Sequence, residues 1–181
     1  MTENQSSLGK GYVQVYTGEC KGKTTAALGQ AFRAAGHGLR TYMGQFLKGQ
    51  LYGELEAARM MQPYIVIEQY GRPGWVHVHE SPEEQDIRAA REGLGKAKEA
   101  LLGGEYDIVI LDEINIAQFF HLISVDDILD IIAAKPEGVE LILTGRYAPT
   151  EVIAAADLVT EMREVKHYFQ AGVRARDGIE R

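Results

Sequence analysis

Gly18-Glu19-Cys20-Lys21-Gly22-Lys23-Thr24-Thr25 decides the fold, because this stretch joins a strand-like run to a helix-like run. Residues 12–16 are rich in Val and Tyr, as strands are, and residues 24–35 have the apolar periodicity of a helix. A glycine loop between two such elements lets consecutive backbone N–H groups point at one phosphate, and the helix N-terminus adds partial positive charge. The stretch therefore predicts a phosphate-binding loop.

The residues at the end of this loop have separate expected roles. Lys23 is expected to reach the outer phosphates of a nucleotide, and the Thr24 hydroxyl is expected to hold Mg²⁺. The usual pattern has four residues between its two glycines, whereas only Glu19, Cys20 and Lys21 lie between the glycines here. A loop that is one residue shorter need not hold a triphosphate in the common orientation.

Short strand-like runs alternate with helical periods on both sides of the loop. Residues 107–112 read Asp-Ile-Val-Ile-Leu-Asp, an apolar run typical of a strand buried on both faces. Strands that alternate with helices predict an α/β fold with a doubly wound, mainly parallel sheet of about six strands and helices on both faces. The expected strands are 12–16, 40–46, 64–70, 107–112, 139–144 and 158–162.

Two of the expected helices have clear start signals. Ser81 is expected to be the N-cap of a long helix, with Pro82 at its first helical position and Gly103 at its end. Ser124 is expected to cap a later helix that carries Asp126 and Asp127 in its first turn. The other expected helices are 24–35, 53–61 and a short one after Pro149.

Acidic residues follow the buried strand at the edge where the phosphate loop is expected. Parallel strands bring their carboxyl ends to one edge of the sheet, so Asp112 and Glu113 should lie beside the loop. Either acid could bind Mg²⁺, and we favour Glu113. Arg146 follows the next strand at the same edge and could reach a phosphate. These residues indicate a protein that uses Mg-ATP, and they leave its second substrate open.

Composition sets the class of the protein. The chain has 181 residues, 45% hydrophobic and 25% charged, which predicts a single domain over residues 11–181 after a flexible tail at 1–10. A net charge of −7 argues against general binding of nucleic acid. Cys20 is the one cysteine, so no internal disulfide can form, which suits a reducing cytoplasm. The sequence has no apolar run long enough to span a membrane, and its N-terminus lacks the charged and apolar regions of a signal peptide. We therefore expect a cytoplasmic protein without membrane contact.

Several blocks of sequence, in order along the chain, also resemble those of a known family. The chain resembles the P-loop type of ATP:corrinoid adenosyltransferase, which has a P-loop NTPase-like (RecA-like) fold, and the shortened loop belongs to the resemblance. The blocks are Gly18-x-x-Lys21-Gly22-Lys23-Thr24-Thr25-Ala26-Ala27, Arg33-Ala34-Ala35-Gly36-His37-Gly38, Gln45-Phe46-x-Lys48-Gly49, Leu111-Asp112-Glu113, Thr144-Gly145-Arg146, 156–162, 166–172 and 175–180.

The resemblance implies a transfer reaction with ATP as co-substrate. In that family Co(I) of a reduced corrinoid attacks the 5′ carbon of ATP, adenosine becomes the upper cobalt ligand, and tripolyphosphate leaves. By position, Lys23, Thr24 and Glu113 would be the catalytic residues, and the metal, Mg²⁺ or Mn²⁺, would be held by Thr24 and Glu113 with Asp112. The implied ATP and phosphate contacts are Gly18, Glu19, Cys20, Lys21, Gly22, Lys23, Thr24, Thr25, Arg33 and Arg146.

The resemblance also implies how the corrinoid is bound. The family uses aromatic residues after the third strand to displace the lower cobalt ligand, and here Trp75 and Tyr70 are the candidates, with Arg72 or Pro73 where a phenylalanine is expected. A homodimer and an electron donor, flavodoxin or a reduced flavin, are further implications. A P-loop kinase or another small-molecule transferase, and a non-catalytic ATP-switched binding module, remain as alternatives. His77 and His79 lack a third ligand at fitting spacing for a metal site.

Overall fold

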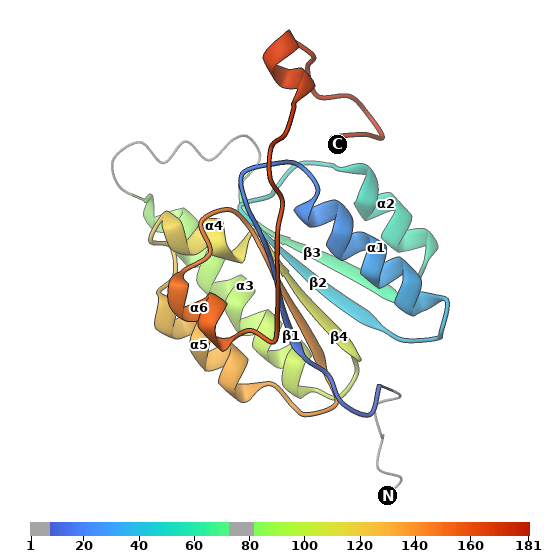
Figure 1. Ribbon diagram of the computed structural model, residues 1–181. Coiled ribbons are helices and arrows are strands. Elements are labelled where there is room, and N and C mark those ends of the chain that lie inside the picture. Colours follow the sequence, from blue (N-terminus) through green and yellow to red (C-terminus); the bar gives the residue numbers. More distant parts are fainter. Residues whose placement is uncertain (1–7, 73–81) are drawn as a thin grey trace, which may run out of the picture.

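The computed structural model describes residues 8–72 and 82–181, and its centre is a sheet of six parallel strands in the order β3-β2-β4-β5-β1-β6. Strand β1, which precedes the phosphate loop, pairs with β5 on one side and with β6 on the other (Figure 1). The predicted α/β fold with a doubly wound, parallel sheet is therefore confirmed. The strands are β1 (Val13–Thr17), β2 (Thr41–Phe46), β3 (Ile65–Tyr70), β4 (Ile108–Asp112), β5 (Glu140–Thr144) and β6 (Leu158–Glu161).

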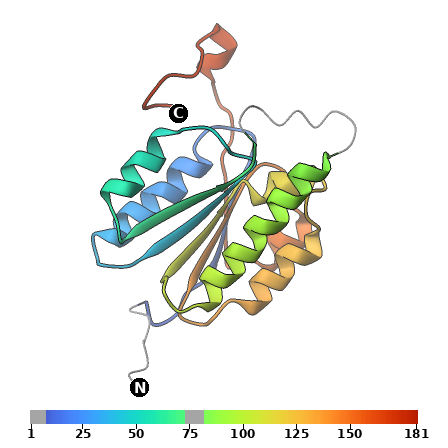
Figure 2. The same ribbon diagram turned by 180° about the vertical axis from the view of Figure 1, so that it is seen from behind.

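Helices cover both faces of the sheet, as Figures 1 and 2 show from opposite sides. Helices α1 and α2 lie on one face, and α3, α4, α5 and α6 lie on the other. None of the described helices is long and apolar enough to span a membrane. Their bounds are α1 (Lys23–Ala35), α2 (Gly53–Met60), α3 (Glu84–Leu102), α4 (Ile114–Phe119), α5 (Val125–Ala134) and α6 (Thr150–Ala155), with a 3₁₀ turn at Tyr168–Ala171.

Side chains of the central strands alternate between two apolar cores. In β4, Ile108 and Ile110 pack toward α1 and α2, whereas Val109 and Leu111 pack toward α3 to α6. Every residue of β4 is buried, which explains why its sequence is a continuous apolar run rather than an alternating one. The run ends at Asp112, whose polar side chain is placed by this register at the carboxyl edge of the sheet.

One of the two predicted helix starts is confirmed by the structure. Ser124 caps α5 in a capping box with Asp127: the Ser124 hydroxyl accepts from the Asp127 backbone N–H at 3.1 Å. The prediction for Pro82 is wrong, because α3 begins at Glu84 and its N-cap is Glu83, whose side chain makes no capping bond. Ser81 lies outside the described residues.

Close packing of α3 against β3 leads to a prediction for two glycines on the same helix. A Cβ atom at Gly93 would lie 2.6 Å from the ring of Tyr70, whose hydroxyl is held by Tyr42 and Glu68, whereas one at Gly95 would meet nothing within 4 Å. We expect Gly93→Ala to lower the free energy of unfolding by about 1–3 kcal/mol through overpacking. The matched control Gly95→Ala should raise it by about 0.5–1 kcal/mol. Urea denaturation measures both, and equal effects would contradict this packing.

Candidate functional site

The phosphate loop lies at the carboxyl edge of the sheet, between β1 and α1. Gly18 and Gly22 have φ angles of 98° and 127°, which L side chains rarely adopt. A Cβ atom at Gly18 would also lie 2.4 Å from the backbone oxygen of Met162, the residue after β6. The same Met162 oxygen accepts a hydrogen bond from the Cys20 N–H at 3.1 Å. The glycines thus let the loop lie directly against the end of β6.

Lys23 is the first residue of α1, and its side chain lies over the loop. Its Nζ donates to the carbonyl oxygens of Gly18 and Cys20, both at 2.8 Å. Burial lowers the pKa of the Lys23 amine, and the carboxylate of Glu113 opposes that shift. The ammonium is therefore held close to the backbone that is expected to bind phosphate.

Asp112 is a fully buried carboxylate that accepts four hydrogen bonds. Its Oδ1 accepts from the hydroxyls of Thr24, at 2.9 Å, and Thr144, at 2.7 Å. Its Oδ2 accepts from Lys48 Nζ at 2.8 Å and from Gln45 Nε2 at 3.3 Å. These bonds join the loop, β2, β4 and β5 at one point.

Glu113 follows Asp112 in a left-handed conformation with φ 62°, and its N–H donates to the Thr144 hydroxyl at 3.0 Å. Burial raises the pKa of the Glu113 carboxyl, and the neighbouring Asp112 raises it further. The positive charges of Lys48, Lys23 and Arg146 oppose this shift. Among the described residues, none donates a hydrogen bond to the Glu113 carboxylate, which leaves its oxygens free for a ligand.

Lys48 and Gln45 were not predicted as site residues, although both follow from the sheet topology. They lie at and just after the carboxyl end of β2, which is the neighbour of β4 in the sheet. Lys48 is mostly buried, and its ammonium also lies 3.8 Å from Glu54 Oε1. Burial alone would lower the pKa of Lys48, but the adjacent Asp112 carboxylate raises it overall. Both residues belong to the block Gln45-Phe46-x-Lys48-Gly49, which could have marked them as site residues.

The two arginines expected at the phosphates lie in different places. Arg146 is exposed at the carboxyl edge, 3.8 Å from Glu19 of the loop. Arg33 is exposed in the last turn of α1, ten residues beyond Lys23 and so about 15 Å along the helix axis. The structure therefore brings Arg146 to the loop and places Arg33 at the opposite end of α1. Among the other loop residues, Lys21 and Thr25 are exposed, and Cys20 is partly buried.

The two aromatic residues expected at the corrinoid are not equally placed. Tyr70 is only 8% exposed, and its hydroxyl bonds to Tyr42 at 2.9 Å and to Glu68. In this structure Tyr70 packs beneath α3, against Gly93. Trp75, like Pro73, lies outside the described residues. Arg72 forms two 2.7 Å bonds with Asp86, which fixes its guanidinium against α3.

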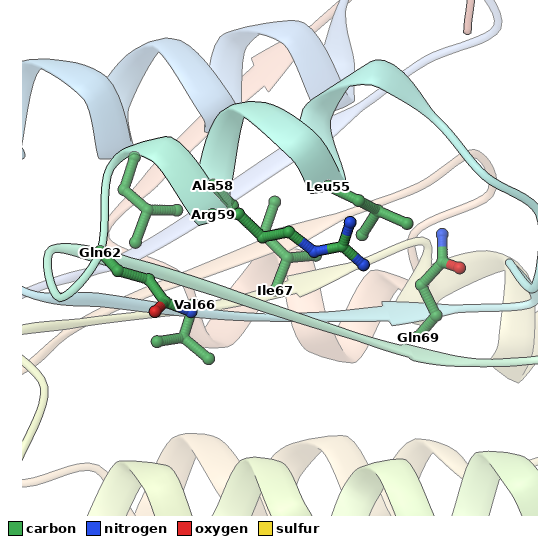
Figure 3. Close-up of a pocket in the computed structure, with 8 residues that line it drawn as sticks. Leu55, Ala58, Arg59, Gln62, Val66, Ile67 and Gln69 are labelled. Carbon is green, nitrogen blue, oxygen red and sulfur yellow. The ribbon is translucent and has the colours of Figure 1, made fainter.

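A cavity of about 280 Å³ lies between α2 and the edge strand β3, away from the phosphate loop (Figure 3). Gln69, at the cavity's end, also donates through Nε2 to Gln45 Oε1 at 3.0 Å. Through Gln45 this wall of the cavity is connected to Asp112. The lining residues are Leu55, Ala58, Arg59, Gln62, Ile65, Val66, Ile67 and Gln69.

The donor set at the carboxyl edge fits a hard divalent cation bound together with phosphate. The Thr24 hydroxyl and the Glu113 carboxylate offer oxygen ligands, which Mg²⁺ prefers, whereas both Asp112 oxygens already accept hydrogen bonds from protein groups. Within residues 8–72 and 82–181, no group of three or more His, Cys, Asp and Glu residues could hold a metal by itself. A cation here would therefore take its remaining ligands from phosphate oxygens and water, as Mg²⁺ does in nucleotide sites.

The sequence of the chain matches a family model over residues 9–181, and that family is described as ATP:corrinoid adenosyltransferase BtuR/CobO/CobP. The chain belongs to this family. As a family member it is a transferase, and the predicted resemblance is confirmed. The kinase and binding-module alternatives are not favoured.

Named relatives agree with the family match. A corrinoid adenosyltransferase of Escherichia coli K12 is 36% identical over 172 residues, covering 94% of this chain and 86% of the relative. One from Pseudomonas aeruginosa is 37% identical over 172 residues, covering 94% and 84%. One from Salmonella typhimurium is 34% identical over 177 residues, covering 97% and 88%.

A solved structure supports the fold of this adenosyltransferase family member. The KaiC-like protein PH0186 from Pyrococcus horikoshii matches with a TM-score of 0.58 at 18% identity, covering 87% of this chain and 75% of the solved chain. At this identity the likeness shows the fold alone, and it agrees with the predicted P-loop NTPase-like architecture.

Proposed function

We propose that this protein transfers the 5′-deoxyadenosyl group of ATP to the Co(I) centre of a reduced corrinoid. The cobalt electron pair forms the Co–C5′ bond, the C5′–O bond of ATP breaks, and tripolyphosphate leaves with the electron pair of that bond. One observation carries the proposal: in a chain of this family, the phosphate loop, Lys23 and two acidic residues meet at one edge of the sheet.

The chain's own residues act mainly on the leaving group. Negative charge develops on the phosphates as the C5′–O bond breaks. The ammonium of Lys23 stabilises it together with the backbone N–H groups of residues 18–24, apart from that of Cys20, which donates to Met162. Because the corrinoid supplies the nucleophile, no protein nucleophile or general base is needed. Arg146, beside the loop, is the further cation that we place at the phosphates. Arg33 and Tyr70 have no role in this proposal because of their positions.

The metal of the site is proposed to be Mg²⁺ or Mn²⁺, held by Thr24 and Glu113. A bound divalent cation neutralises charge on the leaving tripolyphosphate. Thr24 donates its proton to Asp112, so the lone pairs of its oxygen remain available to the metal. Asp112 then orients the Thr24 hydroxyl by accepting its hydrogen bond.

The corrinoid is proposed to contact Trp75, and its identity is left as a class: cobalamin, cobinamide or a cobyrinic acid derivative. Arg72 cannot take the place of an aromatic residue at the cobalt while it is paired with Asp86 and Glu83. We further propose a cytoplasmic homodimer that receives electrons from flavodoxin or a reduced flavin. These last proposals rest on the family alone.

An anaerobic product analysis tests the reaction. Purified protein, Mg-ATP and chemically reduced cob(I)alamin are expected to give a light-sensitive adenosylated corrinoid and an equimolar amount of tripolyphosphate. The visible spectrum follows the cobalt, and anion-exchange chromatography identifies the phosphate product. Persistence of Co(I) while ADP or orthophosphate accumulates would contradict adenosyl transfer and favour a kinase or an ATPase.

A further inference from the structure

The two acids at the site have different surroundings, although they are adjacent in sequence. A carboxylate has about four lone-pair positions, and Asp112 fills all four with protein donors: two hydroxyls on Oδ1, and an amide and an ammonium on Oδ2. The side-chain carboxylate of Glu113 accepts no hydrogen bond from the described residues, and only its backbone carbonyl does, from the Ala117 N–H at 3.0 Å. Asp112 therefore has no free oxygen for a metal, and Glu113 does.

Lys48 is the one charged donor among the four groups on Asp112. Its Nζ lies 2.8 Å from Asp112 Oδ2, and Asp112 is fully buried while the Lys48 side chain is 16% exposed. A charge-assisted bond of this kind is about twice as strong as a neutral one. It also neutralises a carboxylate that would otherwise repel Glu113 and attract a cation.

We propose that Lys48 is a positioning residue that directs the divalent cation to Glu113 by occupying and neutralising Asp112. This inference rests on the proposed function, in which the cation belongs to a metal–ATP site. Without the ammonium, Asp112 Oδ2 keeps only a 3.3 Å bond from Gln45 and becomes available as a second carboxylate ligand. Lys48 thereby determines which of the two acidic residues binds the metal.

The test is a titration of the full-length protein with Mn²⁺, in which free Mn²⁺ is measured by electron paramagnetic resonance without ATP and without a corrinoid. We expect Lys48→Met to bind Mn²⁺ about tenfold more tightly than the wild type. The substitution removes a positive charge near the metal and frees the Asp112 carboxylate to bind it. Lys48→Arg, which keeps the charge and the donors, should bind Mn²⁺ as the wild type does.

Two further variants identify the cause of the change. Adding Asp112→Asn to Lys48→Met should remove the gain, because the freed oxygen is then uncharged. Lys96→Met is the matched control, because it removes the same charge from an exposed pair with Glu99 on α3 and should leave Mn²⁺ affinity unchanged. A Lys48→Met affinity equal to that of the wild type, or a gain that survives Asp112→Asn, would overturn the proposal.

Folding and function are checked separately. Circular dichroism reports whether each variant is folded, and Lys48→Gln replaces Lys48→Met if the methionine variant is not. Lys48→Gln should also bind Mn²⁺ more tightly, and wild-type affinity in that variant would equally refute the role of Lys48. Since the titration contains no corrinoid, failure of adenosyl transfer in the wild type would refute the proposed function without changing this result.

Discussion

Lys23→Ala is expected to lower the rate of adenosyl transfer by about 10²–10³-fold, since it removes the main side-chain charge that stabilises the leaving tripolyphosphate. The ammonium also donates hydrogen bonds to the carbonyl oxygens of Gly18 and Cys20, so the substitution removes two hydrogen bonds within the loop together with the charge. The measurement is the anaerobic rate of adenosylated corrinoid formation at saturating Mg-ATP.

Lys98→Ala serves as the control for this prediction, because it makes the same change on the exposed side of α3. Its transfer rate should equal that of the wild type. Retention of more than a tenth of the wild-type rate by folded Lys23→Ala would show that Lys23 is not the principal charge at the leaving group.

Asp112→Ala is expected to have the largest effect on stability, lowering the free energy of unfolding by about 3–5 kcal/mol. The substitution leaves the mostly buried ammonium of Lys48 with Glu54, 3.8 Å away, as its remaining acidic partner within 4 Å among the described residues. It also leaves the buried hydroxyl of Thr144 without its acceptor. Urea denaturation at constant pH measures the loss.

A double variant separates the unpaired charge from the lost hydrogen bonds. Asp112→Ala with Lys48→Met should recover part of the stability, because removal of both charges costs less than removal of one. Glu105→Ala breaks an exposed pair with Arg40 and should cost less than about 1 kcal/mol. If Asp112→Ala is no more harmful than Glu105→Ala, the buried network contributes little to stability.

The order of elements could be predicted because the apolar patterns are local. The run of residues 107–112 predicted a buried strand, and β4 has every residue buried. Helix α4 was not predicted, because six residues directly after a strand give too little periodicity and no capping residue. Pro82 resembled a first helical residue, but α3 begins two residues later.

The members of the site were harder to predict because they depend on how the strands are ordered in space. Lys48 meets Asp112 only because β2 and β4 are neighbours in the sheet, and sequence order puts β3 and α3 between them. Arg33 shows the opposite case, since the helical rise from Lys23 already places it far from the loop. Tyr70 is aromatic and is the last residue of the expected strand, but its place in the alternation of side chains along β3 directs it inward, against Phe46.

The strand order also bears on when the site can form during synthesis. Strand β1 leaves the ribosome well before its two neighbours in the sheet, β5 and β6, because more than a hundred residues separate it from them in the sequence. The loop after β1 rests on Met162, which is later still. A nascent chain that ends before residue 140 has no partner strand for β1, so nucleotide binding must await the synthesis of β5 and β6.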